Sequence, residues 1–284
     1  MARIVCVGSM NHDITVRVRR RPLPDETLHG ESVAEYRGGK GANQIVAAAR
    51  LGAETAMVAC VGEDSRGDFL VEGLVEDGVD TTHVHRVGEP TGVAVITVDP
   101  DDVSIIIVAG ANGQMDAARA TAAESLIADA DALLLQGEVP ADAAIAAAEI
   151  ARANGTRVVL NPAPFNDVAQ QIVPLADVII VNRQEAHELG DVPDAIVVTT
   201  LGASGSDVTA DGLTSHIGPF DADVIDPTGA GDCFVAAFAV ALAEGSSPDD
   251  AARFANAAGS LATEIEGAQP SLPTRERVDE LLSR

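Results

Sequence analysis

Short, continuously apolar runs alternate with helical stretches along most of this chain, and this alternation constrains the fold more than any other feature. The apolar runs predict strands at residues 4–8, 55–61, 132–136, 157–161, 178–181 and 196–200. Because most of these runs lack alternating polar positions, they are typical of strands buried on both faces of a parallel sheet. Helical patterns lie between them at residues 42–51, 67–77, 117–128 and 141–154. We therefore predict an α/β fold, a doubly wound and mostly parallel sheet flanked by helices.

Two regions break this alternation. Residues 14–36 and 92–108 have strand patterns with no helix of their own, and residues 99–102 have the composition of a turn in the second ribbon. We expect the two ribbons to form a small β-sheet lid from discontinuous segments, residues 12–37 and 90–108. The chain then ends in predicted helices at 229–244, 248–266 and 274–282, and residues 1–284 form one predicted domain.

The charge balance argues against one class of partner. Forty-four acidic residues against eighteen basic ones give a formal net charge of −26. A chain this acidic is not expected to bind nucleic acid, which needs a basic surface. The acids are scattered rather than massed in a tail, which indicates a solvated surface on a folded body. We expect a protein from a salt-adapted organism, because dissolved counterions would screen the repulsion between these acids.

Neither a signal peptide nor a membrane span is predicted. No stretch approaches the roughly 20 apolar residues that cross a bilayer, and the first apolar run is too short for a signal peptide. Cys6, Cys60 and Cys233 lie in apolar contexts without C-x-x-C spacing, so we expect reduced core thiols rather than disulfides or metal ligands. These features predict a cytoplasmic protein.

The run Asp-Pro-Thr-Gly-Ala-Gly-Asp at residues 226–232 precedes a helix that is apolar on every side and must be buried. Asp226 or Thr228 could cap this helix. Asp232 could complement the helix dipole, or it could accept a proton from an alcohol beside an anion site made by the N–H groups of the helix start. Gly229 and Gly231 favour the second interpretation, because a dipole-balancing acid does not need two glycines before it.

A second glycine-rich run, Arg-Gly-Gly-Lys-Gly-Ala-Asn-Gln at residues 37–44, contains the only lysine of the chain, Lys40. The run is not a P-loop, because the G-x-x-x-x-G-K-[ST] spacing is absent. It could be a glycine turn with a solvent-facing lysine. It could instead let backbone amides and Lys40 reach a small polar ligand, which would explain why this lysine alone is present.

Other polar residues follow predicted strands. Asn11 and Asp13 come after the first strand, and Glu138 comes after a later one. Ligands of open α/β sheets bind beyond the carboxyl ends of the strands, so these side chains are candidates for one site, although each could also be a turn or cap residue. Asn182 and Glu185 follow a further strand and, taken alone, predict a helix cap with its capping-box acid.

Together these motifs resemble those of ribokinase-type sugar kinases of the PfkB family, over essentially the whole chain. The resemblance rests on the runs 37–44 and 226–232 and on the opening segment 8–13, Gly-Ser-Met-Asn-His-Asp, which correspond in order to the two family signatures and the sugar-contact element. Segments 90–94, 109–112, 161–164 and 267–271 resemble ribokinases specifically.

The resemblance implies a ribokinase-like fold and a role for each matching residue. Asp232 would deprotonate a sugar hydroxyl for attack on the γ-phosphate of ATP, and the amides of Gly229, Ala230 and Gly231 would stabilise the transferring phosphoryl group. The implied sugar contacts are Asn11, Asp13, Gly39, Lys40, Asn43 and Glu138. The implied nucleotide contacts are Asn182, Thr200, Gly202, Gly205 and Asn256, and Glu185 would organise Mg²⁺ through waters. A K⁺ loop would comprise Asp226, Thr228, Ala262, Ile265, Gly267 and Ser271.

The sequence departs from the family at one place. Ribokinases usually carry another helix after the strand that bears Asn182, whereas here only residues 183–194 lead to the next strand. One flank of the nucleotide side is therefore shorter, which leaves the preferred phosphate donor open.

The implied substrate is D-ribose, phosphorylated at O5, because Asp13 and Glu138 suit hydroxyls and would repel a phosphate already on the sugar. A nucleoside or a sugar phosphate such as ribose 1-phosphate stays an alternative, with the phosphate held by Lys40 or by Arg17, Arg19, Arg20 and Arg21. Those arginines could equally line a solvated ribbon edge or a dimer contact. A non-catalytic regulator that binds sugar or nucleotide is disfavoured, because Asp232 and its glycines are present. The family also suggests a homodimer through the β lids.

Overall fold

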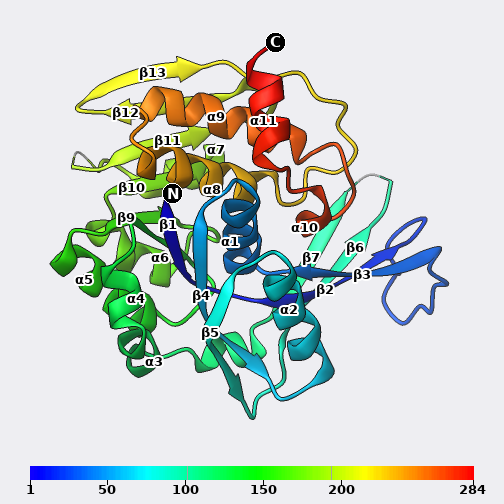
Figure 1. The fold of residues 1–284 in the computed structure, drawn as a ribbon. Coiled ribbons are helices and arrows are strands. Elements are labelled where there is room, and N and C mark those ends of the chain that lie inside the picture. Colours follow the sequence, from blue (N-terminus) through cyan, green and yellow to red (C-terminus); the bar gives the residue numbers. More distant parts are fainter. Residues whose placement is uncertain (101, 193) are drawn as a thin grey trace.

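The centre of the structure is a nine-stranded sheet. The computed structural model describes residues 1–100, 102–192 and 194–284, and Figure 1 shows the arrangement of its elements. The strand order is β13-β12-β11-β10-β9-β8-β1-β4-β5. Neighbours from β11 to β5 run parallel, and β12 and β13 add an antiparallel hairpin at one edge. The strands are β1 (Arg3–Val7), β4 (Glu54–Gly62), β5 (Asp80–Val87), β8 (Ala132–Gln136), β9 (Arg157–Asn161), β10 (Val178–Asn182), β11 (Ile196–Thr200), β12 (Ser206–Ala210) and β13 (Leu213–Ile217).

Helices cover both faces of this sheet, and each face has its own hydrophobic core. Ile4 and Phe238 belong to one core, and Val5 and Leu133 belong to the other. Because neighbouring residues of a strand point to opposite faces, both must be apolar, which explains the continuous apolar runs. The first core includes α1 (Lys40–Arg50), α2 (Ser65–Glu76), α8 (Ala230–Ala243), α9 (Pro248–Leu261) and α11 (Arg275–Leu282), and the second includes α3 (Ala117–Ala122), α4 (Glu124–Ala128), α5 (Ala141–Asn154) and α6 (Asp167–Ile172). The predicted doubly wound α/β fold is confirmed.

A second, four-stranded sheet projects from the main body on the right of Figure 1, and we call it the lid sheet. Its order is β3-β2-β6-β7, formed by β2 (Asn11–Arg17), β3 (Ser32–Gly38), β6 (Gly92–Val98) and β7 (Val103–Val108). The small sheet that the two ribbons predicted is therefore present. The N–H of Asp99 donates to the carbonyl of Asp102 at 3.1 Å between β6 and β7. Asp101, part of the predicted turn, lies outside the described residues.

Several boundaries differ from the predicted ones. The helix predicted at 248–266 ends at Leu261, because the chain turns there and the carbonyl of Thr263 accepts the N–H groups of Ile225 and Asp226. The helix predicted at 117–128 is two short helices, α3 and α4, that meet at Ala123. Strand β5, helix α6 and the β12–β13 hairpin were not predicted. The crossover from β10 to β11 contains one short helix, α7 (Arg183–Leu189).

The remaining composition-based expectations concern cysteines and membrane spans. Cys6, Cys60 and Cys233 are free and buried, as predicted. Within the described part of the chain, no helix has both the length and the apolar character that spanning a bilayer requires.

Candidate active site

The carboxyl ends of the parallel strands share one edge of the main sheet, and the predicted site residues gather there. A cavity of about 150 Å³ at this edge brings together Lys40 from α1, Asn182 from β10, Glu185 from α7 and Asp232 from α8. Its remaining lining residues are Asn161, Ala163, Ile180, Val181, Thr200, Gly229, Gly231 and Val235. We call this the central cavity.

Asp232 lies in the first turn of α8 and is only 7% exposed. Its two oxygens accept hydrogen bonds from different amides: Oδ2 from Asn43 Nδ2 at 3.0 Å and Oδ1 from Gln44 Nε2 at 3.1 Å. Donors on both oxygens stabilise the charged form of a carboxylate and fix its orientation. A charged carboxylate held at the edge of a cavity can accept a proton from a bound hydroxyl.

The backbone just before Asp232 lets a ligand approach closely, because it carries glycines at residues 229 and 231. Gly229 is the N-cap of α8 with a φ of 83°, and a Cβ there would lie 2.9 Å from Ala268 Cα, so a side chain cannot be accommodated. The N–H of Ala230 donates to Pro227 O at 3.2 Å. The N–H groups of Gly229 and Gly231 have no protein acceptor among the described residues. Unpaired N–H groups at a helix start attract an anion.

The helix cap predicted at Asp226 or Thr228 is wrong. Gly229 is the N-cap and no side chain caps α8. The carboxylate of Asp226 accepts instead from the N–H groups of Thr228 and Gly267, both at 2.9 Å. Burial raises the pKa of Asp226, but these hydrogen bonds outweigh it and hold the pKa below its ordinary value. Asp226 therefore ties the loop before α8 to the loop before α10 (Ala268–Ser271).

The other residues predicted for a K⁺ loop lie along the C-terminal stretch 262–271. Ala262 is the C-cap of α9, and Ser271, at the end of α10, donates its hydroxyl to Ala268 O at 2.8 Å. Ile265 is 41% exposed. In the described residues, hydrogen bonds join Asp226 to Thr228 and Gly267 but not to Ala262, Ile265 or Ser271.

Glu138 and Lys40 meet at the cavity edge. The Glu138 carboxylate accepts the Ser9 hydroxyl and the backbone N–H of Lys40, the latter at 3.3 Å. Burial raises the pKa of Glu138, and the Ser9 hydrogen bond and Lys40 oppose that shift. Attraction by Asp232 raises the pKa of Lys40 against its burial, with further help from Glu138. Lys40 therefore stays charged among acids and is not a solvent-facing turn residue.

Asp13 stands at the start of the lid sheet and is 8% exposed. Burial raises its pKa to about 7, and repulsion from Glu138 and Asp232 adds to the shift. Its Oδ1 atom is buried and has no hydrogen-bond partner among the described residues. A buried acceptor without a donor is costly, so this oxygen is suited to a hydroxyl supplied by a ligand.

Asn11, at the start of β2, lies next to Gly39. Asn11 Oδ1 accepts from Asn112 Nδ2 at 2.8 Å, which leaves the Asn11 amide nitrogen available for a ligand. Asn112 also accepts the N–H of Met10 at 2.9 Å, so it positions the whole segment. Gly39 has a φ of 90°, and a Cβ there would lie 2.6 Å from Asn11 N, so this position requires glycine.

A second cavity, of about 490 Å³, adjoins the central cavity, since Thr200 and Gly231 line both. We call it the outer cavity. Gly202, Gly205 and Asn256 also line it, as the resemblance implied for a nucleotide side. Asn256 Nδ2 donates to Ile217 O at 3.2 Å and to Gly218 O at 3.1 Å, so its nitrogen fixes the wall of this cavity. Apolar lining comes from Pro219, Phe220, Val224, Pro227 and Phe234.

Asn182 and Glu185 form the capping box that their spacing predicts. Asn182 Oδ1 accepts from the N–H groups of Gln184 and Glu185, and Glu185 Oε2 accepts from Asn182 N at 2.9 Å. The second carboxylate oxygen of Glu185 has no hydrogen-bond donor in the described chain. Among the described residues, no three His, Cys, Asp or Glu side chains are grouped to hold a metal ion.

The lid arginines are paired with acids. Arg17 contacts Glu266 at 2.7 Å, and Arg19 contacts Glu31 at 3.0 Å. Arg20 pairs with Glu26 at 2.5 Å, and Arg21 pairs with Asp99 at 2.9 Å and Asp102 at 3.3 Å. These pairs favour the solvated-edge interpretation of the arginines, because none of the four is left over for a ligand phosphate.

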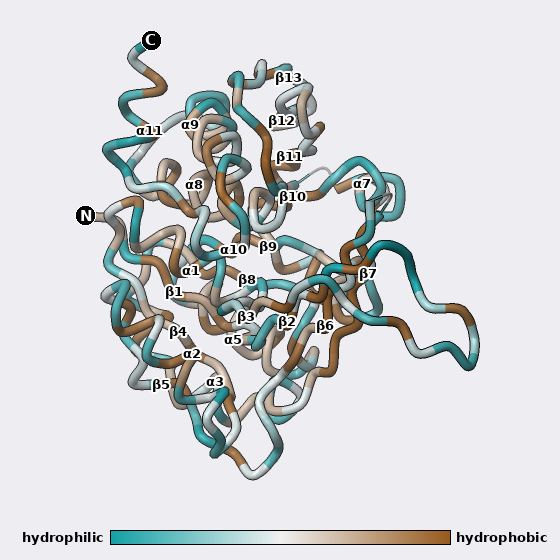
Figure 2. Tube along the Cα trace, turned by 90° about the vertical axis from the view of Figure 1, so that its right-hand side faces the viewer, coloured by the Kyte–Doolittle hydropathy of each residue, from teal (hydrophilic) through white to brown (hydrophobic). Residues whose placement is uncertain are grey.

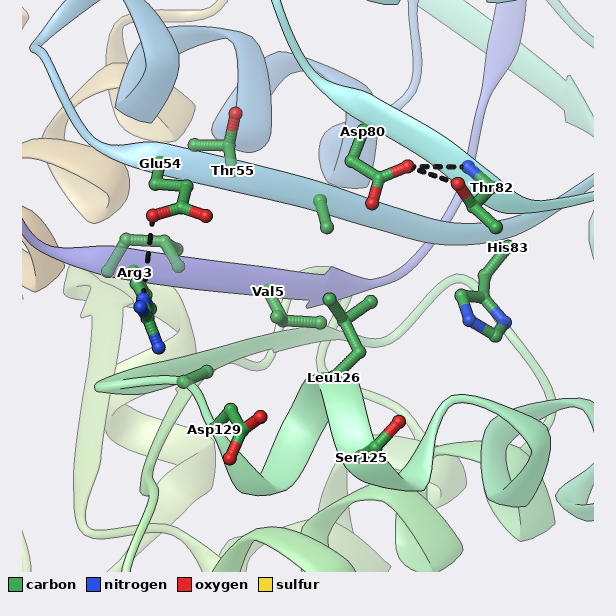
Figure 3. Close-up of a pocket in the computed structure, with 13 residues that line it drawn as sticks. Arg3, Val5, Glu54, Thr55, Asp80, Thr82, His83, Ser125, Leu126 and Asp129 are labelled. Atoms are coloured by element: carbon green, nitrogen blue, oxygen red, sulfur yellow. Dashed lines mark hydrogen bonds and ion pairs between the residues drawn. The ribbon is translucent and has the colours of Figure 1, made fainter.

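A further cavity, of about 400 Å³, lies at the opposite end of the sheet, where β1, β4 and β5 begin (Figure 3). Three of its charged groups already have protein partners: Arg3 pairs with Glu54 at 3.4 Å, and Asp80 accepts from the N–H and hydroxyl of Thr82. The carboxyl ends of the strands, rather than this cavity, therefore carry the candidate chemistry.

Sequence reasoning missed the polar residues that support the site: Ser9, Gln44, Asn112, Gln136 and Asn161, all buried. They lie inside or beside the motifs, and Gln136 and Asn161 end strands that are otherwise apolar. A polar residue at the end of a buried strand is the signal that could have identified them.

Comparison with known proteins gives the family. Residues 1–275 match the pfkB family of carbohydrate kinases. Ribokinase of Haemophilus influenzae is 39% identical over 299 residues, which covers 98% of this chain and 98% of the relative. Ribokinase of Bacillus subtilis is 38% identical over 293 residues, which covers 100% of both.

Solved structures agree with this result. Ribokinase of Thermotoga maritima superimposes with a TM-score of 0.91 at 31% identity, over 100% of both chains. Ribokinase of Arabidopsis thaliana, complexed with ribose and ATP, superimposes with a TM-score of 0.88 at 33% identity, again over 100% of both chains. The chain therefore belongs to the PfkB family of carbohydrate kinases.

Proposed function

We propose that this protein transfers the γ-phosphoryl group of ATP to O5 of D-ribose and so forms ribose 5-phosphate. The observation that carries the proposal is the position of Asp232, a buried carboxylate that is held by two amides and lines the central cavity next to Gly231, which lines both cavities. A sugar beside Asp13 and Glu138, and a nucleotide in the outer cavity whose phosphates extend into the central cavity, would place O5 and the γ-phosphate on either side of the α8 start. The full-length relatives named ribokinase support ribose as the sugar.

In the reaction, Asp232 takes the proton from O5 while O5 attacks the γ-phosphorus. A new O–P bond forms, the bond between the γ-phosphorus and the bridging oxygen of ADP breaks, and the electron pair leaves with ADP. The N–H groups of Gly229 and Gly231 stabilise the negative charge on the transferring group. The N–H of Ala230 would join them by turning from Pro227 O to the phosphoryl group. General-base catalysis of this kind contributes about 10²–10⁴-fold to a rate.

Sugar selection rests on buried acids and amides. Asp13 and Glu138 accept sugar hydroxyls, Asn11 and Asn43 offer amide groups, and Gly39 allows close approach of the backbone. The partnerless Oδ1 of Asp13 supports this role, because a sugar hydroxyl would supply its missing donor. Lys40 would lie beside the reacting oxygens and offset the charge of Asp232.

Nucleotide binding is proposed for the outer cavity, with Thr200, Gly202, Gly205 and Asn256 on its walls. Asn182 would contact the nucleotide from the wall of the adjoining central cavity. Mg²⁺ would be bound mainly by the ATP phosphates and waters, with Glu185 as a water-mediated contact through its free oxygen. The absence of a metal-binding cluster in the described residues fits this mode, since Mg²⁺ in kinases relies on few protein ligands. The ion would neutralise charge on the phosphates when it is bound.

Potassium is part of the proposal. Asp226 joins the segments that carry Thr228 and Gly267, and the predicted loop offers carboxylate, hydroxyl and carbonyl oxygens, the donors that hard cations take. Ala262, Ile265 and Ser271 would complete the set. We also propose adaptation to high salt, because the net charge of −26 needs counterions.

The alternative substrates have less support. A nucleoside or ribose 1-phosphate would need bases to hold its phosphate or a pocket for its base. Arg17, Arg19, Arg20 and Arg21 are each paired with acids. Asp13 and Glu138 would repel a sugar phosphate. A non-catalytic regulator would have no need of the two amides that hold Asp232.

We further propose a homodimer through the lid sheets, in the cytoplasm. Strand β7 is an edge strand whose apolar residues Val103, Ile105, Ile106, Ile107 and Val108 are each at least 50% exposed. Figure 2 shows this hydrophobic stretch on the lid. An exposed apolar edge favours association with a second strand. The three free buried cysteines fit a reducing compartment.

One experiment separates the candidate activities. ADP release is measured with ribose, ribose 1-phosphate, nucleosides and fructose phosphates, in KCl and in choline chloride from low to molar concentration. We expect the highest kcat/KM for ribose, a dependence on K⁺ rather than ionic strength alone, and lower activity at low salt. Asp232→Asn should lower kcat about 10²–10⁴-fold while ribose still binds by calorimetry. Full turnover by Asp232→Asn, or a better substrate than ribose, would contradict the proposal.

A further inference from the structure

Gln44 is a fully buried residue of α1 that contacts Asp232 of α8. Its Nε2 donates to Asp232 Oδ1 at 3.1 Å and to Asn161 Oδ1 at 3.2 Å, and its Oε1 accepts from Gln136 Nε2 at 2.6 Å. A buried amide with these partners is held in place, because rotation would leave buried polar atoms unpaired.

The neighbouring amides decide which way the Gln44 amide faces. Asn161 Nδ2 donates to the carbonyl of Ile180 at 2.8 Å, so the Asn161 oxygen is turned toward Gln44. Gln136 turns its nitrogen toward Gln44 Oε1. Gln44 must therefore present its NH₂ group to Asp232, since the reversed amide would set oxygen against oxygen at both Asn161 and Asp232.

Gln44 does not line the central cavity, whereas Asp232 and Lys40 do. Gln44 therefore reaches the cavity only through hydrogen-bond partners that line it, Asp232 and Asn161, and of these Asp232 is the proposed base. We propose that Gln44, supported by Gln136 and Asn161, is a positioning residue that holds the Asp232 carboxylate in the orientation and charge state in which it accepts the sugar proton. This inference rests on the proposed function.

The charge state matters because other acids share the site. Asp13 and Glu138 face Asp232 and repel its charge, and Lys40 attracts it. An N–H donor stabilises the charged form of a carboxylate in such surroundings. Gln44 supplies one of the two side-chain donors of Asp232 in these surroundings, and the carboxylate must be unprotonated to act as the base.

The orientation matters because each oxygen has one dedicated donor. Gln44 holds Oδ1, and Asn43 holds Oδ2 at 3.0 Å. With both bonds present, the carboxylate cannot turn about its Cβ–Cγ bond. A misplacement of about 1 Å in a reacting group can lower a rate about 100-fold.

Gln44→Glu tests the proposal most sharply, because it keeps the shape of the side chain and replaces the donor with an acid. We expect kcat for ribose to fall about 10–100-fold, with KM for ribose changed less than about threefold. The acid limb of the kcat/KM profile should move to higher pH by about one unit or more, because two facing carboxylates retain a proton. A purely structural role would not move this limb.

Gln44→Met is the second variant, since it removes the donor without adding a charge and decides the question if Gln44→Glu does not fold. We expect kcat to fall about tenfold with ribose KM retained. Thr55→Val is the matched control: Thr55 is 5% exposed, its hydroxyl has no hydrogen-bond partner among the described residues, and it lies by the cavity of Figure 3 at the far end of the sheet. Thermal unfolding is measured for all variants.

Folded Gln44→Glu and Gln44→Met proteins with kcat within about twofold of the parent and an unmoved acid limb would overturn the inference. A parent protein that does not phosphorylate ribose would instead contradict the proposed function. The two failures are therefore distinguishable.

Discussion

The floor of the candidate active site and the lid sheet above it are built by opposite means. In the floor, Asp232, Asn43, Gln44, Gln136 and Asn161 are each at most 8% exposed and are joined by amide hydrogen bonds. In and around the lid sheet, exposed arginines pair with acids whose side chains are at least 29% exposed, and the apolar edge strand β7 is exposed.

This difference separates two tasks. A buried network cannot rearrange without leaving polar atoms unpaired, so it suits the positioning of a reacting group. Exposed ion pairs contribute about 0–1 kcal/mol each and form or break at little cost. The exposed apolar strand gains free energy when it is covered. The floor is thus suited to fix geometry, and the lid sheet to bind a second surface.

The largest expected effect concerns the lid sheet. Ile106→Glu places a charge on the apolar β7 edge of both copies of the proposed dimer. We expect the dimer dissociation constant to rise on the order of 100-fold or more, because each charge would be buried without a partner. Sedimentation velocity at micromolar concentration should show about twice 29.1 kDa for the parent and about 29.1 kDa for the variant.

Leu213→Glu is the matched control for this experiment. Leu213 is 75% exposed on β13, one of the two edge strands of the main sheet, so the substitution places the same charge on an exposed apolar residue outside the lid sheet. It should leave the dimer intact. A parent protein that sediments as a monomer, or equal dissociation of both variants, would show that the lid sheet is not the dimer interface.

The next largest expected effect is the contribution of Asp13 to the pH dependence of folding stability. Burial raises the pKa of Asp13 from 3.8 to about 7 in the folded protein. Between these two values the folded state binds more protons than the unfolded state, so the stability of the ligand-free protein should fall as pH rises from about 4 to 7. The slope from this group is at most about 1.4 kcal/mol per pH unit, or tenfold in the folding constant.

Urea unfolding between pH 4.5 and 8 checks this slope in the parent and in Asp13→Asn, which should lose it. Glu149→Gln, which removes an exposed acid, controls for net charge. Ribose should bind more tightly as pH rises through 7, because its hydroxyls donate to the charged carboxylate. Equal pH slopes in the parent and Asp13→Asn would mean that burial does not hold the proton on Asp13.

The same contrast explains how far the sequence predicts the structure. The predicted bounds of β8, β9 and β11 equal the observed ones. Each strand has a continuous apolar centre, as expected of strands inside a parallel sheet, although β11 is only partly buried. The β12–β13 hairpin was missed because it lies at the sheet edge, where only some positions must be apolar. The end of α9 was missed because Thr263 leaves the helix to pair with Ile225 and Asp226, a contact between residues distant in sequence.

The site divides in the same way. Its charged residues stand in glycine-rich motifs and could be found from local spacing, as Lys40 and Asp232 show. The amide side chains that support these charged residues could not be found from local spacing. Gln44, Gln136 and Asn161 come from three separate elements that only the fold brings together. The cap predicted at Asp226 failed for a similar reason, since its carboxylate reaches Gly267 instead.

The smallest effect tests the link between the two regions. Arg17 in β2 pairs with Glu266 in the loop beside Gly267, and both side chains are about 45% exposed. A double-mutant cycle with Arg17→Gln and Glu266→Gln should give a coupling energy of at most about 1 kcal/mol that fades in molar KCl, since exposed pairs are weak and screened. The Arg19–Glu31 pair, which lies between β2 and β3, provides the reference cycle.

If the Arg17–Glu266 coupling exceeded about 2 kcal/mol and resisted salt, the lid sheet would be anchored to the main body by a far stronger contact than exposed charges provide. The contrast between a fixed floor and a loosely held lid would then fail at this contact.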